Sequence, residues 1–427
     1  MPPRSRTPSA AKGGTQEDVR RHNLGTVLGH LHLSGPLTRA ELTARMGLNR
    51  STIAGLVTEL GALGAVREER PGGSQPGAGR PSIVVRPAAD DVQVVAADVG
   101  VDRVVVALVG LGGRIVARRR RRITNRSPAA VAALICRLVD AVLADPAAGD
   151  RIVGLGVSVP GAIRHADGCV RFAPNLGWVD APFGELLARQ LGDLPVRVGN
   201  DADLGILAEH RRGAARGFDD VVFVAGDVGV GGGLIVGGAP LVGAGGYAGE
   251  LGHILVHPGG LPCRCGSQGC WETEIGAPAI TRALGLDPVT TEDLVQAVRA
   301  ATAAGSPALD EVARHIGLGL ASIVNLVNPR LVIIGGLLRE VYPSTAHLVR
   351  AALDSAALAA PSEQVTIVTP ELGGDVFLVG AAELAWQDLL DDPAATLRRP
   401  RPGARAASHP PGRRRRPDLV MGQASAS

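Results

Sequence analysis

Aromatic residues, lysine and long apolar runs are scarce in this chain of 427 residues. Phe, Trp and Tyr make up 2% of it, so any buried core has to be built from Ala, Val, Leu and Ile. No apolar run reaches the roughly 18 residues of a membrane span, and the N-terminal stretch lacks the apolar core of a signal peptide. We therefore expect a cytoplasmic protein without a membrane partner, in which disulfide bonds rarely persist.

Cysteine is also rare, but three of the five cysteines lie close to a histidine in one Gly/Pro-rich loop. One imidazole and three thiolates form a soft tetrahedral ligand set that suits zinc. Cys136 and Cys169 lie apart from this loop, and we expect them to be packing residues. The alternative is a loop of ordinary buried thiols. The predicted zinc ligands are His253, Cys263, Cys265 and Cys270.

The net charge of +3 is unevenly distributed along the chain. Residues 1–86 carry +6 and residues 398–427 carry +7, so the residues between them carry −10. Basic ends on an acidic body indicate that an end of the chain, and not the body, meets a polyanion. The length predicts two or three domains, each long enough to bury a core.

Residues 20–88 have the pattern of a small helical domain followed by two strands. Thr38 and Glu41 have capping-box spacing, and Gly47 is a natural helix end. After the turn at 47–49, a second helix is indicated from Arg50 onward by one apolar stripe. That stripe consists of Ile53, Leu56, Val57, Leu60 and Leu63.

A helix, a tight turn and a second helix with a polar N-terminal end can enter the major groove of DNA. The residues that follow predict a strand, a Gly/Pro loop and a second strand, which together form a wing, and Arg80 is placed to reach phosphate or the minor groove. An ordinary helical hairpin with a solvated face is the alternative. The predicted DNA-binding residues are Asn49, Arg50, Ser51, Thr52 and Arg80.

Two later stretches, 94–116 and 221–243, resemble each other. Each has an apolar strand, a DVG turn, a second strand and a Gly-rich turn. Such an internal repeat indicates two related α/β lobes that face a cleft. Two unrelated β-hairpins are the alternative.

The basic module resembles the winged helix-turn-helix of bacterial sugar-responsive repressors in the ROK family (repressor, open reading frame, kinase). The resemblance continues to about residue 390 through the motifs GVSVPGAI, FAPNLGW, GNDAD, GELGH, CxCGxxGCxE and LVNPRLVIIGG. It implies an α/β fold, in which residues 92–390 form an actin-like (ribonuclease H-like) two-lobed domain with a zinc loop at 253–270. Residues 1–19 and the Arg/Pro-rich residues 398–427 are expected to be disordered.

The resemblance also implies which residues bind a hexopyranose. Carboxylates and amides suit a ring of hydroxyls because they form several charge-assisted hydrogen bonds. In a kinase of this family, Asp201 would be the base that deprotonates the attacking hydroxyl. His253 would ligate zinc through one ring nitrogen and bind sugar through the other. The implied sugar-binding residues are Asn175, Asn200, Asp201, Glu250, His253 and Glu272.

The phosphate-binding turns depart from the kinase pattern. ROK kinases carry D-x-G-G-T-K in the first turn, whereas this chain has DVGVDR, with Asp102 in place of the threonine. The second turn, usually G-T-G-V-G, is DVGVG and begins with Asp227. Two carboxylates beside a triphosphate disfavour ATP binding, because like charges about 4 Å apart cost about 4 kcal/mol at an effective dielectric near 20.

We therefore interpret the chain as a sugar-responsive DNA-binding regulator, in which a hexose or a derivative is the effector and the zinc is structural. A ROK sugar kinase, alone or combined with DNA binding, is the alternative. The expected partners are operator DNA, the sugar and further copies of the chain, in a homodimer or a homotetramer. The arginine run at 118–122 is expected on an exposed strand edge.

Overall fold

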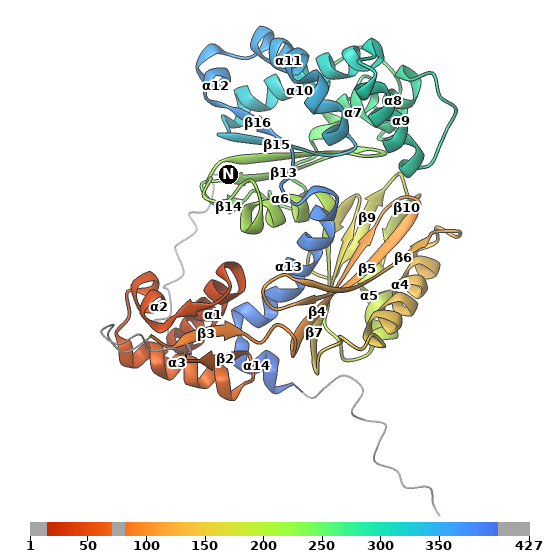
Figure 1. The fold of residues 1–427 in the computed structure, drawn as a ribbon. Helices are drawn as coiled ribbons and strands as arrows, with labels where there is room; N and C mark the ends of the chain where they lie inside the picture. Colours follow the sequence, from red (N-terminus) through yellow and green to blue (C-terminus); the bar gives the residue numbers. More distant parts are fainter. Residues whose placement is uncertain (1–14, 71–81, 400–427) are drawn as a thin grey trace, which may run out of the picture.

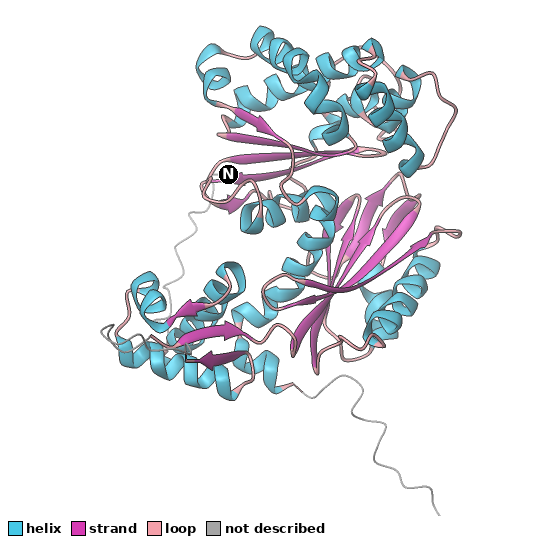
Figure 2. Ribbon diagram, viewed as in Figure 1, coloured by secondary structure: helices cyan, strands magenta, loops and turns pink. Residues whose placement is uncertain are grey.

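The structure is a computed structural model and describes residues 15–70 and 82–399 (Figure 1). These residues form a small N-terminal domain and a larger body with two lobes, and helices cover the sheets of both lobes (Figure 2). Within the two described ranges, no helix is long and apolar enough to cross a membrane. Arg80 and most of the two ends that were predicted to be disordered lie outside the described residues.

The N-terminal domain combines a helix-turn-helix with a small sheet. Strand β3 pairs antiparallel with both β1 and β2, so β2 and β3 are the two strands of the predicted wing. The elements are α1 (Gln16–Ser34), β1 (Leu37–Thr38), α2 (Arg39–Met46), α3 (Arg50–Ala62), β2 (Val66–Glu69) and β3 (Val84–Pro87).

The helix-turn-helix has the caps that its sequence predicts. Thr38 and Glu41 form a capping box at the start of α2, and Gly47 ends this helix in the left-handed conformation with φ of 65°. Asn49 caps α3 by accepting a hydrogen bond from the backbone N–H of Thr52. The apolar stripe of α3 is buried at Ile53, Leu56, Val57 and Leu60, whereas Leu63 is partly buried at the C-cap.

Helix α1 begins at Gln16, so our expectation that residues 16–19 are disordered was wrong. Thr15 and Asp18 form a second capping box, which the sequence analysis overlooked. The helix is then stabilised by packing of Leu24, Leu28 and their neighbours into the core of the domain. At the other end of the chain, Arg398 is also helical, because it closes α14 (Pro393–Arg398).

The first lobe of the body is built on a five-stranded sheet with the order β11-β7-β4-β5-β6. Val94 of β4 packs toward α13 and Val95 packs toward α4, as the alternation of side chains in a strand requires. The elements are β4 (Val92–Val99), β5 (Arg103–Gly110), β6 (Ile115–Arg122), α4 (Pro128–Leu143), β7 (Arg151–Val159), β8 (Ala162–Arg164), β9 (Cys169–Ala173), β10 (Trp178–Ala181), α5 (Phe183–Leu191) and β11 (Val196–Asn200).

The second lobe has the sheet order β14-β13-β12-β15-β16, with α10 on one face and α6 on the other. Its elements are α6 (Asp201–Arg212), β12 (Val221–Gly226), β13 (Val230–Val236), β14 (Ala239–Pro240), η1 (Leu251–His253), α7 (Trp271–Ile275), α8 (Ala277–Ala283), α9 (Thr291–Ala303), η2 (Pro307–Leu309), α10 (Asp310–Val327), β15 (Leu331–Gly336), α11 (Leu338–Ala356), α12 (Ala359–Gln364), β16 (Thr366–Val368) and η3 (Gly373–Asp375).

The two repeated stretches of the sequence occupy equivalent places in the two sheets. Each forms an antiparallel hairpin, β4 with β5 in the first lobe and β12 with β13 in the second. Asp98, next to the end of β4, and Asp227, directly after β12, therefore face one cleft from opposite lobes. This repetition confirms the predicted α/β fold with two actin-like lobes.

Helix α13 (Val376–Asp391) connects all three parts of the molecule (Figure 1). It packs on the sheet of the first lobe, on α6 of the second, and on α1 of the N-terminal domain. The approach is close, because a Cβ atom added to Gly380 of α13 would lie 2.1 Å from the carbonyl oxygen of Leu204 in α6. Likewise, a Cβ on Gly25 of α1 would lie 2.1 Å from the carbonyl oxygen of Leu390.

The arginine run lies on β6, which is the edge strand of its sheet, as predicted. Three of its side chains form ion pairs, and two of these join β6 to distant elements. Arg118 pairs with Asp375 at 2.6 Å, and Arg120 pairs with Glu292 at 2.8 Å. Charged side chains on an edge strand discourage pairing with another chain.

Candidate functional site

A cleft of about 250 Å³ lies between the two lobes, and polar side chains from both lobes line it. All six predicted sugar-binding residues are among these side chains. The polar lining consists of Asp98, Arg103, Asn175, Asn200, Asp201, Asp227, Glu250, His253, Glu272 and Thr291.

Most of these side chains sit at the end of a strand or the start of a helix. Asp98 lies next to the end of β4, and Asp201 begins α6 directly after β11. Glu250 precedes the short helix η1, His253 ends it, and Glu272 lies in the first turn of α7. Short turns between regular elements thus bring together residues that are more than a hundred positions apart.

Asn200 holds the start of α6 in place. Its Nδ2 donates to the carbonyl of Gly161 at 2.9 Å, and its Oδ1 accepts from the backbone N–H of Asp203 at 3.0 Å. Both ends of this amide are therefore already used within the protein. Asn200 lines the cleft, and its clearest role here is to cap the helix that carries Asp201.

Burial in the cleft makes its carboxyl groups hard to ionise. Burial raises the pKa of Asp201 to about 7, and the nearby Asp227 adds to this shift. Burial likewise raises the pKa of Asp98 to about 6, although the Arg103 guanidinium opposes the shift. Near neutral pH the cleft therefore holds carboxyl groups that can either donate or accept hydrogen bonds.

Asp203 lies beside the cleft and was missed in the sequence analysis. It lines a smaller hollow beside the cleft together with Asn200 and Glu250. Burial and, to a smaller extent, the charge of Glu250 raise its pKa to about 7. The GNDAD motif contains this residue two positions after Asp201, and that spacing in the first turn of a helix was the signal that could have identified it.

The first of the two turns that bind phosphate in ROK kinases, DVGVDR in this chain, differs from our expectation. We expected the carboxylates of Asp102 and Asp227 to lie beside the triphosphate position, but only Asp227 is among the residues that line the cleft. Arg103, the first residue of β5, lines the cleft instead. The Asp102 carboxylate pairs with the Arg103 guanidinium at 3.6 Å, so part of its charge is compensated.

Four predicted metal ligands converge beside the cleft. One ligand atom from each of His253, Cys263, Cys265 and Cys270 lies within 4.8 Å of every other. The Sγ atoms of Cys265 and Cys270 are 3.7 Å apart, and Sγ of Cys263 is 3.7 Å from Nδ1 of His253. A tetrahedral zinc ion with Zn–S bonds of about 2.3 Å places two sulfurs about 3.8 Å apart, so this donor set fits zinc.

The loop with these four residues also contacts the cleft. His253 lines the cleft while its Nδ1 faces Cys263. Glu272 accepts from the thiol of Cys263 at 3.6 Å through Oε1 and from the backbone N–H of Val230 at 3.0 Å through Oε2. Asn175 accepts from the Arg264 guanidinium of the loop at 2.7 Å. The loop therefore supports three predicted sugar-binding residues.

The two remaining cysteines are apart from this cluster, as predicted. Cys169 is buried on β9, and Cys136 is half-buried on α4. Cys136 packs against the core of the first lobe.

The predicted DNA-binding residues that the structure describes form the exposed N-terminal end of α3. The Asn49 side chain accepts from both Ser51 Oγ at 2.7 Å and Thr52 N at 2.8 Å, so it is primarily a helix cap. Arg50 and Ser51 are exposed, whereas Thr52 is half-buried. Arg80 lies outside the described residues.

Known proteins resemble this chain in two groups. The xylose repressor of Bacillus subtilis is 27% identical over 381 residues, which covers 88% of this chain and 98% of the repressor. A glucokinase of Streptomyces coelicolor is 30% identical over 309 residues and covers 67% of this chain and 96% of the kinase. The repressor likeness therefore includes the N-terminal domain, which the kinase likeness leaves out.

The solved structures that resemble this chain also include a regulator and a kinase. A ROK family transcriptional regulator, a homolog of the E. coli MLC protein, matches 88% of this chain and 97% of its own with a TM-score of 0.72 and 25% identity. A ROK family glucokinase from Streptomyces griseus in complex with glucose and AMPPNP matches 69% of this chain with a TM-score of 0.61 and 30% identity. The model of the ROK family matches residues 94–388, and this chain belongs to the ROK family.

Proposed function

We propose that this chain is a sugar-responsive transcriptional repressor. Helix α3 and the wing bind operator DNA, and the cleft between the lobes binds a hexose or a hexose derivative as effector. The observation that carries this proposal is the combination, in one chain, of a helix-turn-helix with an exposed polar helix end and a cleft lined by carboxyl groups. The likeness to the xylose repressor over 88% of the chain supports it.

The cleft suits a sugar because it offers many hydrogen-bonding groups on a partly apolar surface. Glu250, Glu272 and His253 come from the second lobe, and Asn175 comes from the first. A ligand that is bound by residues of both lobes favours the arrangement in which the lobes are closed around it. Closure of the lobes is the change that we expect to alter operator affinity.

We further propose one structural zinc ion per chain, held by His253, Cys263, Cys265 and Cys270. Four protein ligands leave no open coordination position, so the metal supplies no catalytic group. It would hold the loop that positions Glu272, Asn175 and the second nitrogen of His253. The sulfur and nitrogen separations of 3.7 Å support this assignment.

Sugar phosphorylation is the second candidate function. The pKa of Asp201, raised to about 7 by burial, favours it because a general base works best near the ambient pH. Asp227 opposes it, since this carboxylate lines the cleft where the second phosphate turn of a kinase has glycine. We propose that phosphoryl transfer is absent or very weak in this chain.

Operator binding with and without sugar tests the repressor proposal. A DNA sequence selected from random oligonucleotides by the purified protein serves as the probe, and a thermal-shift screen of monosaccharides that includes glucose and xylose identifies the effector. We expect the effector to bind without ATP and to change operator affinity by about 5- to 150-fold. Failure to select any DNA sequence would contradict the proposal. We also expect a homodimer or a homotetramer, because paired recognition helices read paired half-sites, and light scattering measures this.

A further inference from the structure

Helix α6 reaches from the sugar cleft to the N-terminal domain. Its first residue, Asp201, lines the cleft, and its last two residues, Arg211 and Arg212, lie at the other end. A helix of 12 residues is about 18 Å long. One rigid element therefore touches both of the regions that a sugar-responsive repressor must couple.

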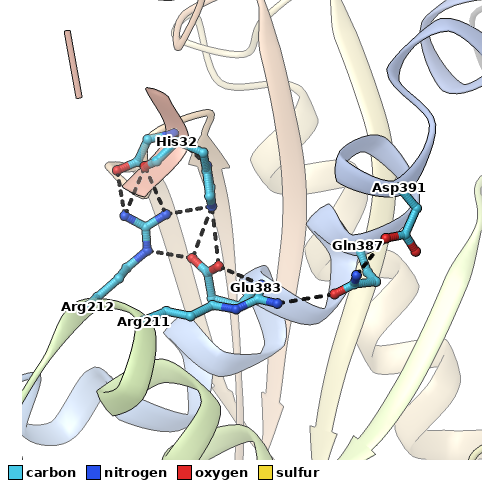
Figure 3. Close-up of polar contacts among 7 residues, drawn as sticks. His32, Arg211, Arg212, Glu383, Gln387 and Asp391 are labelled. Carbon is cyan, nitrogen blue, oxygen red and sulfur yellow. Dashed lines mark hydrogen bonds and ion pairs between the residues drawn. The ribbon is translucent and has the colours of Figure 1, made fainter. Parts of the chain in front are cut away.

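The far end of α6 enters a buried polar cluster (Figure 3), which we call the junction. Glu383 of α13 accepts from Arg212 Nε at 2.5 Å and from Arg211 Nη1 at 3.1 Å. The Nε2 atom of His32, near the end of α1, lies 3.2 Å from the same carboxylate. The junction consists of His32, Arg211, Arg212 and Glu383.

The junction joins four elements from all parts of the molecule. Arg212 also donates to the carbonyl of Gly112, at the turn between β5 and β6, at 3.0 Å and to the carbonyl of His32 at 3.3 Å. The backbone N–H of Gly112 donates to Nδ1 of His32 at 3.0 Å. The Arg212 guanidinium thus binds the N-terminal domain, the first lobe and α13 at the same time.

The buried Glu383 carboxylate of the junction stays ionised only because its partners surround it. The side chains of His32 and Glu383 are 0% and 1% exposed, and that of Arg212 is 13% exposed. Burial alone would raise the pKa of Glu383, but His32, Arg212 and Arg211 hold this pKa well below its ordinary range. A buried carboxylate is costly when one partner moves away, so the junction favours one arrangement of α6 against α1.

The helices around the junction have no room to slide independently. Gly380 lets the backbone of α13 contact α6 at Leu204, and Gly25 lets α1 contact α13 at Leu390. Side-chain rotation cannot absorb a displacement where backbone meets backbone. A shift of α6 on closure of the lobes therefore reaches α13 and α1.

We propose that the junction couples the sugar cleft to the DNA-binding domain, with Arg212 and Glu383 as positioning residues that make the orientation of α1 depend on the position of α6. This inference rests on the proposed repressor function. It predicts that the junction carries the response to sugar, while the sugar contacts and the DNA contacts themselves lie elsewhere. Sugar and operator then affect each other through the junction to the same degree in both directions.

The test measures four affinities in the full-length protein: operator with and without the effector sugar, and sugar with and without operator. Two ratios follow: operator affinity without sugar to that with sugar, and sugar affinity without operator to that with operator. Glu383→Gln keeps the shape of the side chain but loses its charge, and we expect both ratios in this variant to come within about twofold of one. Arg212→Lys, which keeps the charge but loses the forked geometry, should behave in the same way. Arg211 lies at the half-buried margin of the junction, so Arg211→Ala should bring both ratios only partly toward one. This variant provides the test if the other two do not fold.

Arg151 provides a matched control. It donates from β7 to the carbonyl of Leu63, at the end of α3, at 2.9 Å, so it also contacts the N-terminal domain but does not touch α6. Arg151→Gln should keep both ratios at the unmodified values. A loss of response as large as that in the junction variants would show a merely structural role and overturn the inference.

Two further outcomes separate this inference from the proposed function. If the unmodified protein binds operator and sugar without any mutual effect, the proposed function itself fails. If the unmodified protein responds and all three junction variants respond equally, the proposed function stands and the junction has no coupling role. A junction variant that weakens operator binding equally with and without sugar also contradicts the inference, because its ratio is unchanged.

Discussion

The thiol of Cys263 lies 3.6 Å from the Oε1 atom of Glu272, so a predicted zinc ligand and a predicted sugar-binding carboxylate are in direct contact. His253 makes the same connection within one side chain, because it lines the cleft and faces Cys263 through Nδ1. The metal loop and the sugar site therefore form one continuous structure. Loss of the metal should therefore weaken sugar binding in the cleft.

Cys265→Ser should lower the zinc content, the melting temperature and the sugar affinity together. Zinc would join four ligands of one loop, so its binding energy contributes to folding. Metal analysis by mass spectrometry, thermal unfolding and sugar titration measure the three effects. Cys136→Ser is the control, because Cys136 is half-buried on α4 and apart from the loop. Equal zinc in Cys265→Ser and the unmodified protein would contradict the assignment.

Glu250→Ala should abolish the sugar response and leave operator binding without sugar intact. The residue lines the cleft and lies outside the N-terminal domain. In the unmodified protein, sugar at about a hundred times its Kd should stabilise the folded state by about 2.7 kcal/mol, and this stabilisation should disappear in the variant. The exposed Glu363 on α12 provides the control variant Glu363→Ala. A variant that still responds to the same sugar at the same concentration would place the effector site elsewhere.

Sugar affinity should fall as the pH falls below about 7. Burial, with Asp227 and then Asp98 and Asp203 nearby, raises the pKa of Asp201 to about 7, so at pH 6 this carboxyl is mainly protonated. Sugar hydroxyls donate stronger hydrogen bonds to a charged carboxylate than to a neutral carboxyl group, so protonation of Asp201 competes with sugar binding. The Kd for sugar should therefore rise about tenfold for each pH unit well below this pKa. Asp203, whose pKa burial also raises to about 7, acts in the same direction.

Calorimetric titrations at pH 6, 7 and 8 measure this dependence. Asp201→Asn should bind more weakly and vary less with pH, because the amide cannot ionise. A Kd that stays constant from pH 6 to pH 8 in the unmodified protein would show that neither carboxyl accepts from the sugar.

Nucleotide binding should be very weak, and sugar-dependent ADP release should be far below the roughly 10 per second of an ordinary enzyme. Asp227 lines the cleft and would face the triphosphate; burial raises its pKa, whereas the Arg103 and Arg339 guanidinium groups oppose this shift and favour the charged form. Asp227→Gly should therefore strengthen AMPPNP binding at least about tenfold, measured by calorimetry. ADP release at an ordinary enzymatic rate by the unmodified protein would favour a bifunctional kinase.

Arg50→Ala should cost about 1 to 3 kcal/mol of operator binding if Arg50 reads a base, and it should relax the sequence preference at that position. The side chain is exposed at the N-terminal end of α3. Arg80→Ala tests the wing in the same assay. The control is Arg189→Ala, on α5 of the first lobe, far from α3 in the fold. Unchanged operator affinity in both Arg50→Ala and Arg80→Ala would exclude this mode of docking.

Local order along the sequence determined the helix-turn-helix, the metal loop and the repeated hairpins. Thr38, Glu41 and Gly47 act within one short helix, so capping rules suffice to predict it. The spacing of Cys263, Cys265 and Cys270 brings three thiols together through a short loop, and the motif resemblance supplied the order of the cleft residues. The capping box of Thr15 and Asp18 was equally local and could have been predicted.

Only the tertiary structure decided which polar side chains from distant parts of the sequence contact each other. At the first turn, Arg103 lines the cleft and Asp102 does not, and residue spacing alone does not show which of two neighbours faces inward. The contact between His32 and Glu383 joins residues 351 positions apart, and it exists because α13 packs against both α1 and α6. Contacts between buried polar groups on distant elements depend on how those elements pack, because a buried carboxylate is stable only beside its partners. Packing is a property of the whole chain.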